Sequence, residues 1–155
     1  MTQQPSPPDW VIAAPFRAHL RHLRDGTGLP WGVLARVAGV SPRLVHHLVL
    51  GRGGRYPRRI THESASRLIA LDRNSLARLA VEWVPAGRTR LQVRQLLAAG
   101  ADPDRLAAWC RLSRTQLLAL AGAARCTRLV ALLVDTACPP HLAIPADEDA
   151  GREAA

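Results

Sequence analysis

The chain has 155 residues, and its 21 cationic residues, all of them Arg, outnumber 12 Asp and Glu to give a formal net charge of +9. Hydrophobic residues make up 48% of the chain, which is enough to bury a core and excludes a chain that is disordered throughout. No apolar run reaches the roughly 20 residues of a membrane-spanning helix, and residues 1–5 lack the basic start and apolar centre of a secretion signal. We therefore expect a cytoplasmic protein. Its basic charge favours association with the nucleoid.

The two ends of the chain differ in composition from its middle. Residues 1–9 are polar and rich in Pro, and residues 138–155 are acidic and small, so we expect both ends to be disordered. Between them, Leu, Ala, Val and Arg recur at helical spacing, as in residues 64–71, while alternating β-branched residues are scarce. The sequence therefore predicts an all-α fold for residues 10–137.

An internal repeat divides this folded part into a first unit, residues 10–82, and a second, residues 83–137. Residues 10–13 (Trp-Val-Ile-Ala) match residues 83–86 (Trp-Val-Pro-Ala) at an offset of 73. The offset is 72 where Ser41 matches Ser113, and 61 where residues 67–71 match residues 128–132. The sequence therefore predicts two related units, the second lacking 11 residues between its third and fourth helices.

Residues 31–48 have the pattern of a helix-turn-helix motif. Ala35 is small where two helices would cross closely, and Gly39 suits the positive φ of a sharp turn. Ser41 is a good N-cap and Pro42 suits a first helical turn, so a second helix is predicted over residues 41–50. Its apolar side, which would dock on the first helix, consists of Val40, Val45 and Leu48.

The segment after this helix, residues 51–59, holds four Arg and no acid. We interpret it as a flexible loop whose arginines neutralise phosphates or enter a minor groove; the alternative is a solvated, disordered loop. Thr61 is predicted to cap a fourth helix that ends near Asp72. The candidate DNA-contacting residues of the first unit are Arg36, Ser41, Pro42, Arg43, His46, His47, Arg52, Arg55, Tyr56, Arg58 and Arg59.

The second unit keeps the pattern over residues 106–120 but loses polar residues. Arg111 replaces the turn glycine, and Leu118 and Ala119 stand where the first unit has two histidines. Residues 1–87 have a net charge of +7 and residues 88–155 one of +2. We therefore expect the first unit to supply most DNA affinity and the second to be a weaker reader, a homodimerisation unit or a packing partner. The second unit's candidate DNA contacts are Arg114, Thr115 and Gln116.

These motifs together resemble a family of small tandem helix-turn-helix proteins of actinobacteria and their phages. The resemblance covers about residues 10–135 and rests on residues 10–11 (Trp-Val), 48–52 (Leu-Val-Leu-Gly-Arg), 58–61 (Arg-Arg-Ile-Thr), 67–71 (Arg-Leu-Ile-Ala-Leu) and 84–92. The chain departs from the family pattern at Pro85, where the family has Asp. The resemblance implies binding to double-stranded DNA.

The function that we expect is a sequence-specific transcriptional regulator, with a nonspecific nucleic-acid binder and a helical protein-interaction adaptor as alternatives. An enzyme is disfavoured, because neither a phosphate-binding loop nor a nucleophile motif is recognisable. No cofactor and no metal site are expected. His19 and His22 are interpreted as surface residues, and a zinc site built from Cys110, Cys126, Cys138 and His141 is disfavoured by its ligand spacing.

Overall fold

The computed structural model of the protein describes residues 9–139, so most of the disorder expected for residues 1–9 and 138–155 lies outside this range. At the edges the expectation is wrong, because the Asp9 carbonyl accepts from the His62 amide at 2.7 Å and the Cys138 amide donates to the Val134 carbonyl at 3.1 Å. The chain divides between Leu76 and Ala77 into two compact parts, unit 1 and unit 2. The sequence places the boundary six residues later, after residue 82. The difference arises because residues 79–82 hydrogen-bond to unit 2: the Leu79 carbonyl accepts from the Leu129 amide at 2.9 Å.

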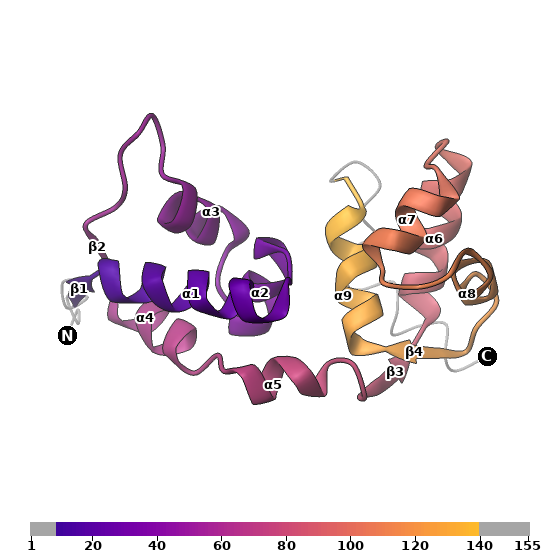
Figure 1. The fold of residues 1–155 in the computed structure, drawn as a ribbon, viewed down its shortest axis with the longest axis horizontal. Coiled ribbons are helices and arrows are strands. Elements are labelled where there is room, and N and C mark those ends of the chain that lie inside the picture. The colour runs from indigo at the N-terminus through magenta and orange to yellow at the C-terminus, as the bar shows by residue number, and fades with distance from the viewer. Residues whose placement is uncertain (1–8, 140–155) are drawn as a thin grey trace, which may run out of the picture. The chain divides into compact units, whose positions relative to one another are not determined.

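Unit 1 is a helical unit closed by a short antiparallel sheet (Figure 1). Its elements are β1 (Trp10–Ile12), α1 (Ala14–Thr27), α2 (Trp31–Ala38), α3 (Pro42–Leu50), β2 (Arg59–Thr61) and α4 (His62–Ile69). β1 pairs with β2, with Trp10 opposite Thr61 and Ile12 opposite Arg59. The Ala13 amide continues the pairing with a 2.9 Å hydrogen bond to the Arg58 carbonyl. The start of the unit is thereby fixed to the segment that precedes α4.

Unit 2 repeats this order of elements. Helix α5 (Arg73–Arg78) crosses the boundary and is followed by β3 (Trp83–Pro85), α6 (Gly87–Ala98), α7 (Pro103–Trp109), α8 (Arg114–Leu120), β4 (Arg125–Thr127) and α9 (Arg128–Ala137). β3 pairs with β4, with Trp83 opposite Thr127. The expected helical character is confirmed, but the all-α class is wrong because each unit contains a two-stranded sheet. No helix between residues 9 and 139 is both long and apolar enough to cross a membrane.

Equivalent residues of the two units occupy equivalent positions up to the third helix. Leu20 and Val93, 73 residues apart, are both fully buried, and Val45 and Leu117, 72 apart, are buried in the same way. The match proposed for the last helix is wrong. Thr61 and Thr127 each accept the hydrogen bond that caps this helix, so the true offset is 66 and the second copy is six residues shorter rather than 11.

The fourth helix ends earlier than the sequence predicts. Thr61 caps α4 as expected, but α4 stops at Ile69 instead of running to Asp72. The Asp72 carboxylate accepts a 2.6 Å hydrogen bond from the Ser75 amide and so begins α5. Asp is a preferred N-cap residue, so Asp72 begins a new helix instead of ending the fourth one.

The turn between the second and third helices has the same form in both units. Gly39 has a φ of +74°, and Arg111, its equivalent, is a non-glycine residue with a positive φ, +59°. The next amide bonds back to the preceding helix in each case, from Val40 to Ala35 at 3.0 Å and from Leu112 to Ala107 at 2.9 Å. The left-handed turn is therefore a requirement of the fold that unit 2 meets with a conformationally costly residue.

We predict that Gly39→Ala destabilises unit 1 by about 1–2 kcal/mol, because alanine strains a left-handed backbone. A Cβ added at this position would meet no atom within 4 Å, so a steric clash contributes nothing. Gly39→Asn is the control and should cost less, since Asn tolerates this conformation. Amide hydrogen exchange of Val45 and Leu117 reports the two units separately; an Ala variant as stable as the parent contradicts the prediction.

Candidate nucleic-acid interface

Helix α3 is held against α2 by a row of buried apolar side chains. Ala35 on α2 is fully buried, as are Val45 and Leu48 on α3. The Ser41 hydroxyl accepts a 3.1 Å hydrogen bond from the Leu44 amide, which caps α3 as the sequence predicts. With one side docked and its start fixed, α3 presents its opposite side to solvent.

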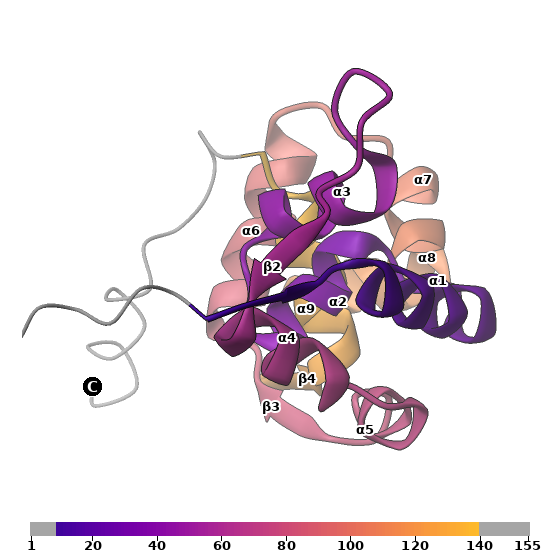
Figure 2. The same ribbon diagram turned by 90° about the vertical axis from the view of Figure 1, so that its left-hand side faces the viewer.

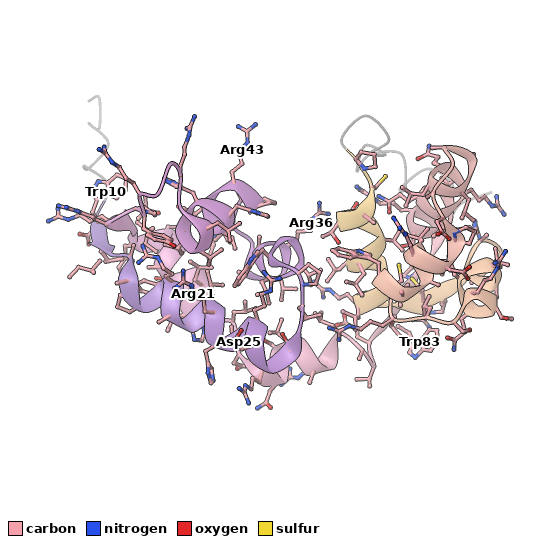
Figure 3. The ribbon with its side chains drawn as sticks, turned by 45° about the horizontal axis from the view of Figure 1, so that its top comes forward. Trp10, Arg21, Asp25, Arg36, Arg43 and Trp83 are labelled. Carbon is pink, nitrogen blue, oxygen red and sulfur yellow. The ribbon has the colours of Figure 1, made fainter. Side chains whose placement is uncertain are left out.

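The exposed side of α3 carries Arg43, His46 and His47. They line a concave surface of about 720 Å³ with Ser41, Leu44, Leu50, Gly51 and Arg52. Figure 3 shows the Arg43 side chain pointing outward from the helix. The structure therefore brings together one group of predicted contact residues from α3 and the start of the segment that follows it.

That segment forms a tight hairpin where the sequence suggests a flexible loop. Arg52 and Arg55 exchange backbone hydrogen bonds of 2.8 and 3.1 Å. Gly53 and Gly54 between them both have positive φ angles, +58° and +75°, as a type I′ turn requires. In Figures 1 and 2 the segment between α3 and β2 projects well beyond α3. We call residues 51–56 the arginine hairpin.

Two arginines of α1 fix this hairpin to the end of α3. The Arg17 guanidinium donates to the Leu48 carbonyl at 2.7 Å and to the Pro57 carbonyl at 2.9 Å, and Arg21 donates to the Val49 carbonyl at 2.9 Å. The Arg17 guanidinium also lies over the Tyr56 ring, 4.5 Å from its centre. A cation at the Leu48 and Val49 carbonyls is favourable, because the C-terminal end of a helix carries a partial negative charge.

Neither arginine of α1 is among the residues predicted from the sequence, although the repeat contains a signal for one of them. Arg17 matches Arg90 at an offset of 73, and Arg90 donates in the same way to the Ala123 carbonyl at 3.2 Å. A basic residue retained at matched positions in both copies indicates a structural role within each unit. Tyr56, a predicted DNA contact, belongs to this anchoring cluster, with 46% of its surface exposed.

The remaining predicted residues of unit 1 are more scattered. Arg55 and Arg58 line a second hollow, of about 750 Å³, together with Tyr56. Arg59 lies exposed on β2, opposite Ile12. Arg36 is exposed on the last turn of α2, and Figure 3 shows it pointing in a different direction from Arg43. Pro42 is exposed at the first turn of α3.

Charge is uncompensated along this surface. The structure gives no hydrogen bond or ion pair, within residues 9–139, to the guanidinium groups of five arginines: Arg43, Arg52, Arg55, Arg58 and Arg59. Some other arginines pair with acids, Arg67 with Glu63 at 2.7 Å and Arg88 with Asp135 at 3.2 Å, whereas Arg78 and Arg94 have no such partner among the described residues either. Five such cations within 17 residues of the sequence, none of them with a carboxylate partner in the described part of the chain, are suited to a polyanion.

In unit 2, the residues at the corresponding positions either have partners within the unit or are apolar. Arg114 forms an ion pair with Asp104 at 3.2 Å, and Gln116 accepts a 2.9 Å hydrogen bond from the Ser113 amide in a capping box. Thr115 is exposed. Leu118, which replaces His46, is 48% exposed. Unit 2 also has an apolar hollow of about 350 Å³, lined among others by Trp83, Leu112, Ala119, Ala123 and Val130.

The histidines of α1 have structural partners. His19 is half-buried and hydrogen-bonds through Nε2 to the Leu71 carbonyl at 2.8 Å, which corrects its interpretation as a surface residue. His22 lies 3.3 Å from an Arg73 nitrogen. Within the described residues no group of three or more His, Cys, Asp or Glu side chains could hold a metal ion.

The three cysteines form no disulfide with one another. Burial raises the pKa of Cys110 to about 11, and burial also raises the pKa of Cys126 and of Cys138. Near neutral pH these groups are therefore protonated and poorly nucleophilic. His141, the remaining member of the disfavoured zinc set, lies outside the described residues.

Comparison of the chain with protein-family models, with curated proteins and with solved structures gave no match. The resemblance to tandem helix-turn-helix proteins stays a prediction. The function is therefore inferred from this chain's own surface.

We predict that Gly51→Ala disrupts the arginine hairpin while leaving α3 folded. A Cβ at this residue would lie 2.8 Å from the Arg55 carbonyl oxygen, and the φ of Gly51 is +72°. The amides of Arg52 and Arg55 should exchange with solvent at least about tenfold faster, equivalent to roughly 1.4 kcal/mol of lost protection, while Val45 is unchanged. Gly122→Ala is the control, because its Cβ would meet nothing closer than 3.9 Å. Unchanged exchange at Arg52 would contradict this explanation of the turn.

Proposed function

We propose that the protein is a sequence-specific binder of double-stranded DNA that acts as a transcriptional regulator of the repressor type. The observation that carries the proposal is the surface formed by α3, the arginine hairpin and the segment up to β2, with five arginines that have no partner within residues 9–139. In this proposal α2, its turn and α3 constitute a helix-turn-helix motif. The buried residues dock α3 on α2, and the exposed residues are left for DNA.

The mechanism follows from which side of α3 is free. α3 enters the major groove, where Arg43 near its N-terminal end reads base edges together with His46 and His47. Guanidinium groups bind guanine O6 and N7 bidentately, so Arg43 supplies the largest share of base discrimination. Arg58 and Arg59, beyond the hairpin, hold the sugar-phosphate backbone and fix the register of the helix on the duplex.

Unit 2 is proposed to be a second helix-turn-helix unit that has lost DNA reading. Its equivalent order of elements and its left-handed turn at Arg111 support a common architecture. Two of its three candidate contacts, Arg114 and Gln116, already have partners inside the unit. To contact DNA, these side chains would first have to break their interactions within the unit, which makes the free energy of binding less favourable.

We predict different effects from two arginine substitutions. Arg43→Ala should lower the ratio of the affinity for the preferred site to the affinity for bulk DNA, because a base contact is lost. The expected loss of specificity is about 1–3 kcal/mol. Arg58→Ala should weaken binding to all sequences alike and reduce the slope of log affinity against log salt by about 1. Arg94→Ala on α6 is the control, since it removes the same charge from an exposed position in unit 2.

Random-oligonucleotide selection, followed by mobility shift at fixed salt, measures both effects. One enriched motif indicates reading by a single unit, and two spaced motifs indicate reading by both. Selection without enrichment, together with equal binding to all duplexes, favours the nonspecific binder. A protein that retains no DNA at moderate salt is the interaction adaptor, and in that case the proposal is wrong.

The apolar surface of unit 2 favours a second role, homodimerisation. A two-fold interface needs a self-complementary patch, and unit 2 has both an apolar hollow and the exposed side chain of Leu118. A dimer would also present two copies of α3 to the two halves of a palindromic site.

We predict that Leu118→Glu reduces self-association at least about tenfold, because a carboxylate would be buried against apolar side chains. Ile69→Glu is the control, since it places the same charge at an exposed apolar position of unit 1. Sedimentation velocity over a concentration series measures the effect. A protein that is monomeric throughout, or one in which both variants associate like the parent, would rule out this interface.

A further inference from the structure

The tip of the arginine hairpin is narrow and stands in open space. A Cβ at Gly53 or Gly54 would meet no atom within 4 Å. The glycines therefore serve the backbone turn and do not make room for a neighbouring side chain. A tip without side chains allows the backbone to approach another surface closely.

The two residues that flank the tip place like charges together. Arg52 and Arg55 are paired across the hairpin, so their side chains leave the same face of the ribbon. Like charges directly opposite each other are unfavourable, and the structure gives neither guanidinium an acid or carbonyl partner within residues 9–139. An anion between or beside the two groups would remove this repulsion, so the hairpin itself points to an anionic ligand.

The hairpin starts at the end of the face that is proposed to read DNA. The Gly51 amide bonds to the His47 carbonyl at 3.0 Å, and Arg52 lines the same concave surface as Arg43 and His47. Gly51 and Arg52 alone separate the end of α3 from the Gly53-Gly54 tip, so Arg52 and Arg55 lie directly beyond the helix. With α3 in the major groove, we place these two long side chains toward the strand that separates this groove from the next minor groove.

We propose that Arg52 and Arg55 enter the minor groove beside the site bound by α3 and select A·T base pairs there. This inference rests on the proposed placement of α3 in the major groove. A-tracts have a narrow minor groove whose negative potential attracts arginine. Guanine puts an N2 amino group into that groove, which adds a donor and obstructs a cationic donor such as guanidinium. The hairpin thus reads sequence outside the segment contacted by α3.

Duplex probes that contain inosine distinguish base recognition in the minor groove from contact with phosphates. An I·C pair presents the major-groove acceptors of G·C but lacks the minor-groove amino group, as A·T does. The probes are duplexes that share the selected central site and carry A·T, G·C or I·C pairs in the flank. The parent chain should bind the A·T and I·C flanks alike and at least about fivefold more tightly than the G·C flank, at the lower end of what one unfavourable base pair costs.

The double variant Arg52→Ala/Arg55→Ala should bind all three flanks equally. Arg43→Ala is the matched control; it should weaken binding to every probe and keep the preference for I·C over G·C, because Arg43 faces the major groove. If the parent chain binds I·C and G·C flanks with one affinity, the hairpin contacts phosphates only and the inference is wrong while the proposed function stands. A preference that survives in the double variant also overturns it. Failure to bind any duplex at moderate salt overturns the proposed function itself.

Discussion

The guanidinium group of Arg17 joins three segments of unit 1 that are far apart in the sequence. It extends from α1 to the last turn of α3, to the Pro57 carbonyl after the hairpin, and to the face of Tyr56. Hydrogen bonds to a charged group contribute about 1.5–3 kcal/mol each, so this cluster restrains the hairpin firmly against α3. Without it, the backbone turn alone would define the hairpin's shape but not its direction. The proposed reading of two neighbouring grooves depends on that fixed direction.

The two units show how one architecture can carry different surfaces. Both close with a two-stranded sheet, both cap their last helix with Thr, and both turn through a left-handed residue before the third helix. Unit 1 adds six residues that form most of a basic hairpin, and it keeps polar side chains on α3. Unit 2 lacks these six residues, exposes Leu118 on α8 and has an apolar hollow. The net charge follows this division, because the basic excess lies in the half of the chain that has the hairpin.

Local signals in the sequence predicted the local parts of this structure. The cap at Ser41, the turn at Gly39 and the docking of Val45 and Leu48 each depend on residues within one turn of a helix. The strands were missed because each has three residues and its partner lies about 40 to 50 residues away, too far for periodicity to register. The hairpin was foreseeable, since adjacent glycines between two extended residues favour a type I′ turn. The anchoring by Arg17 could not be predicted. Its acceptors are backbone carbonyls 31 and 40 residues further along the chain, and because every residue has a carbonyl, the sequence does not indicate which ones accept.

In our proposal unit 1 binds DNA through α3 and the arginine hairpin acting as one fixed surface. Backbone amide chemical shifts, followed by NMR as a short duplex carrying the selected site is added, test this central claim most directly. We expect the largest changes to fall on Arg43, His46, His47, Arg52 and Arg55, and the amides of α8 to stay unchanged apart from any effect of dimerisation. Changes concentrated on α8, or an unaltered spectrum with excess duplex at moderate salt, would contradict it.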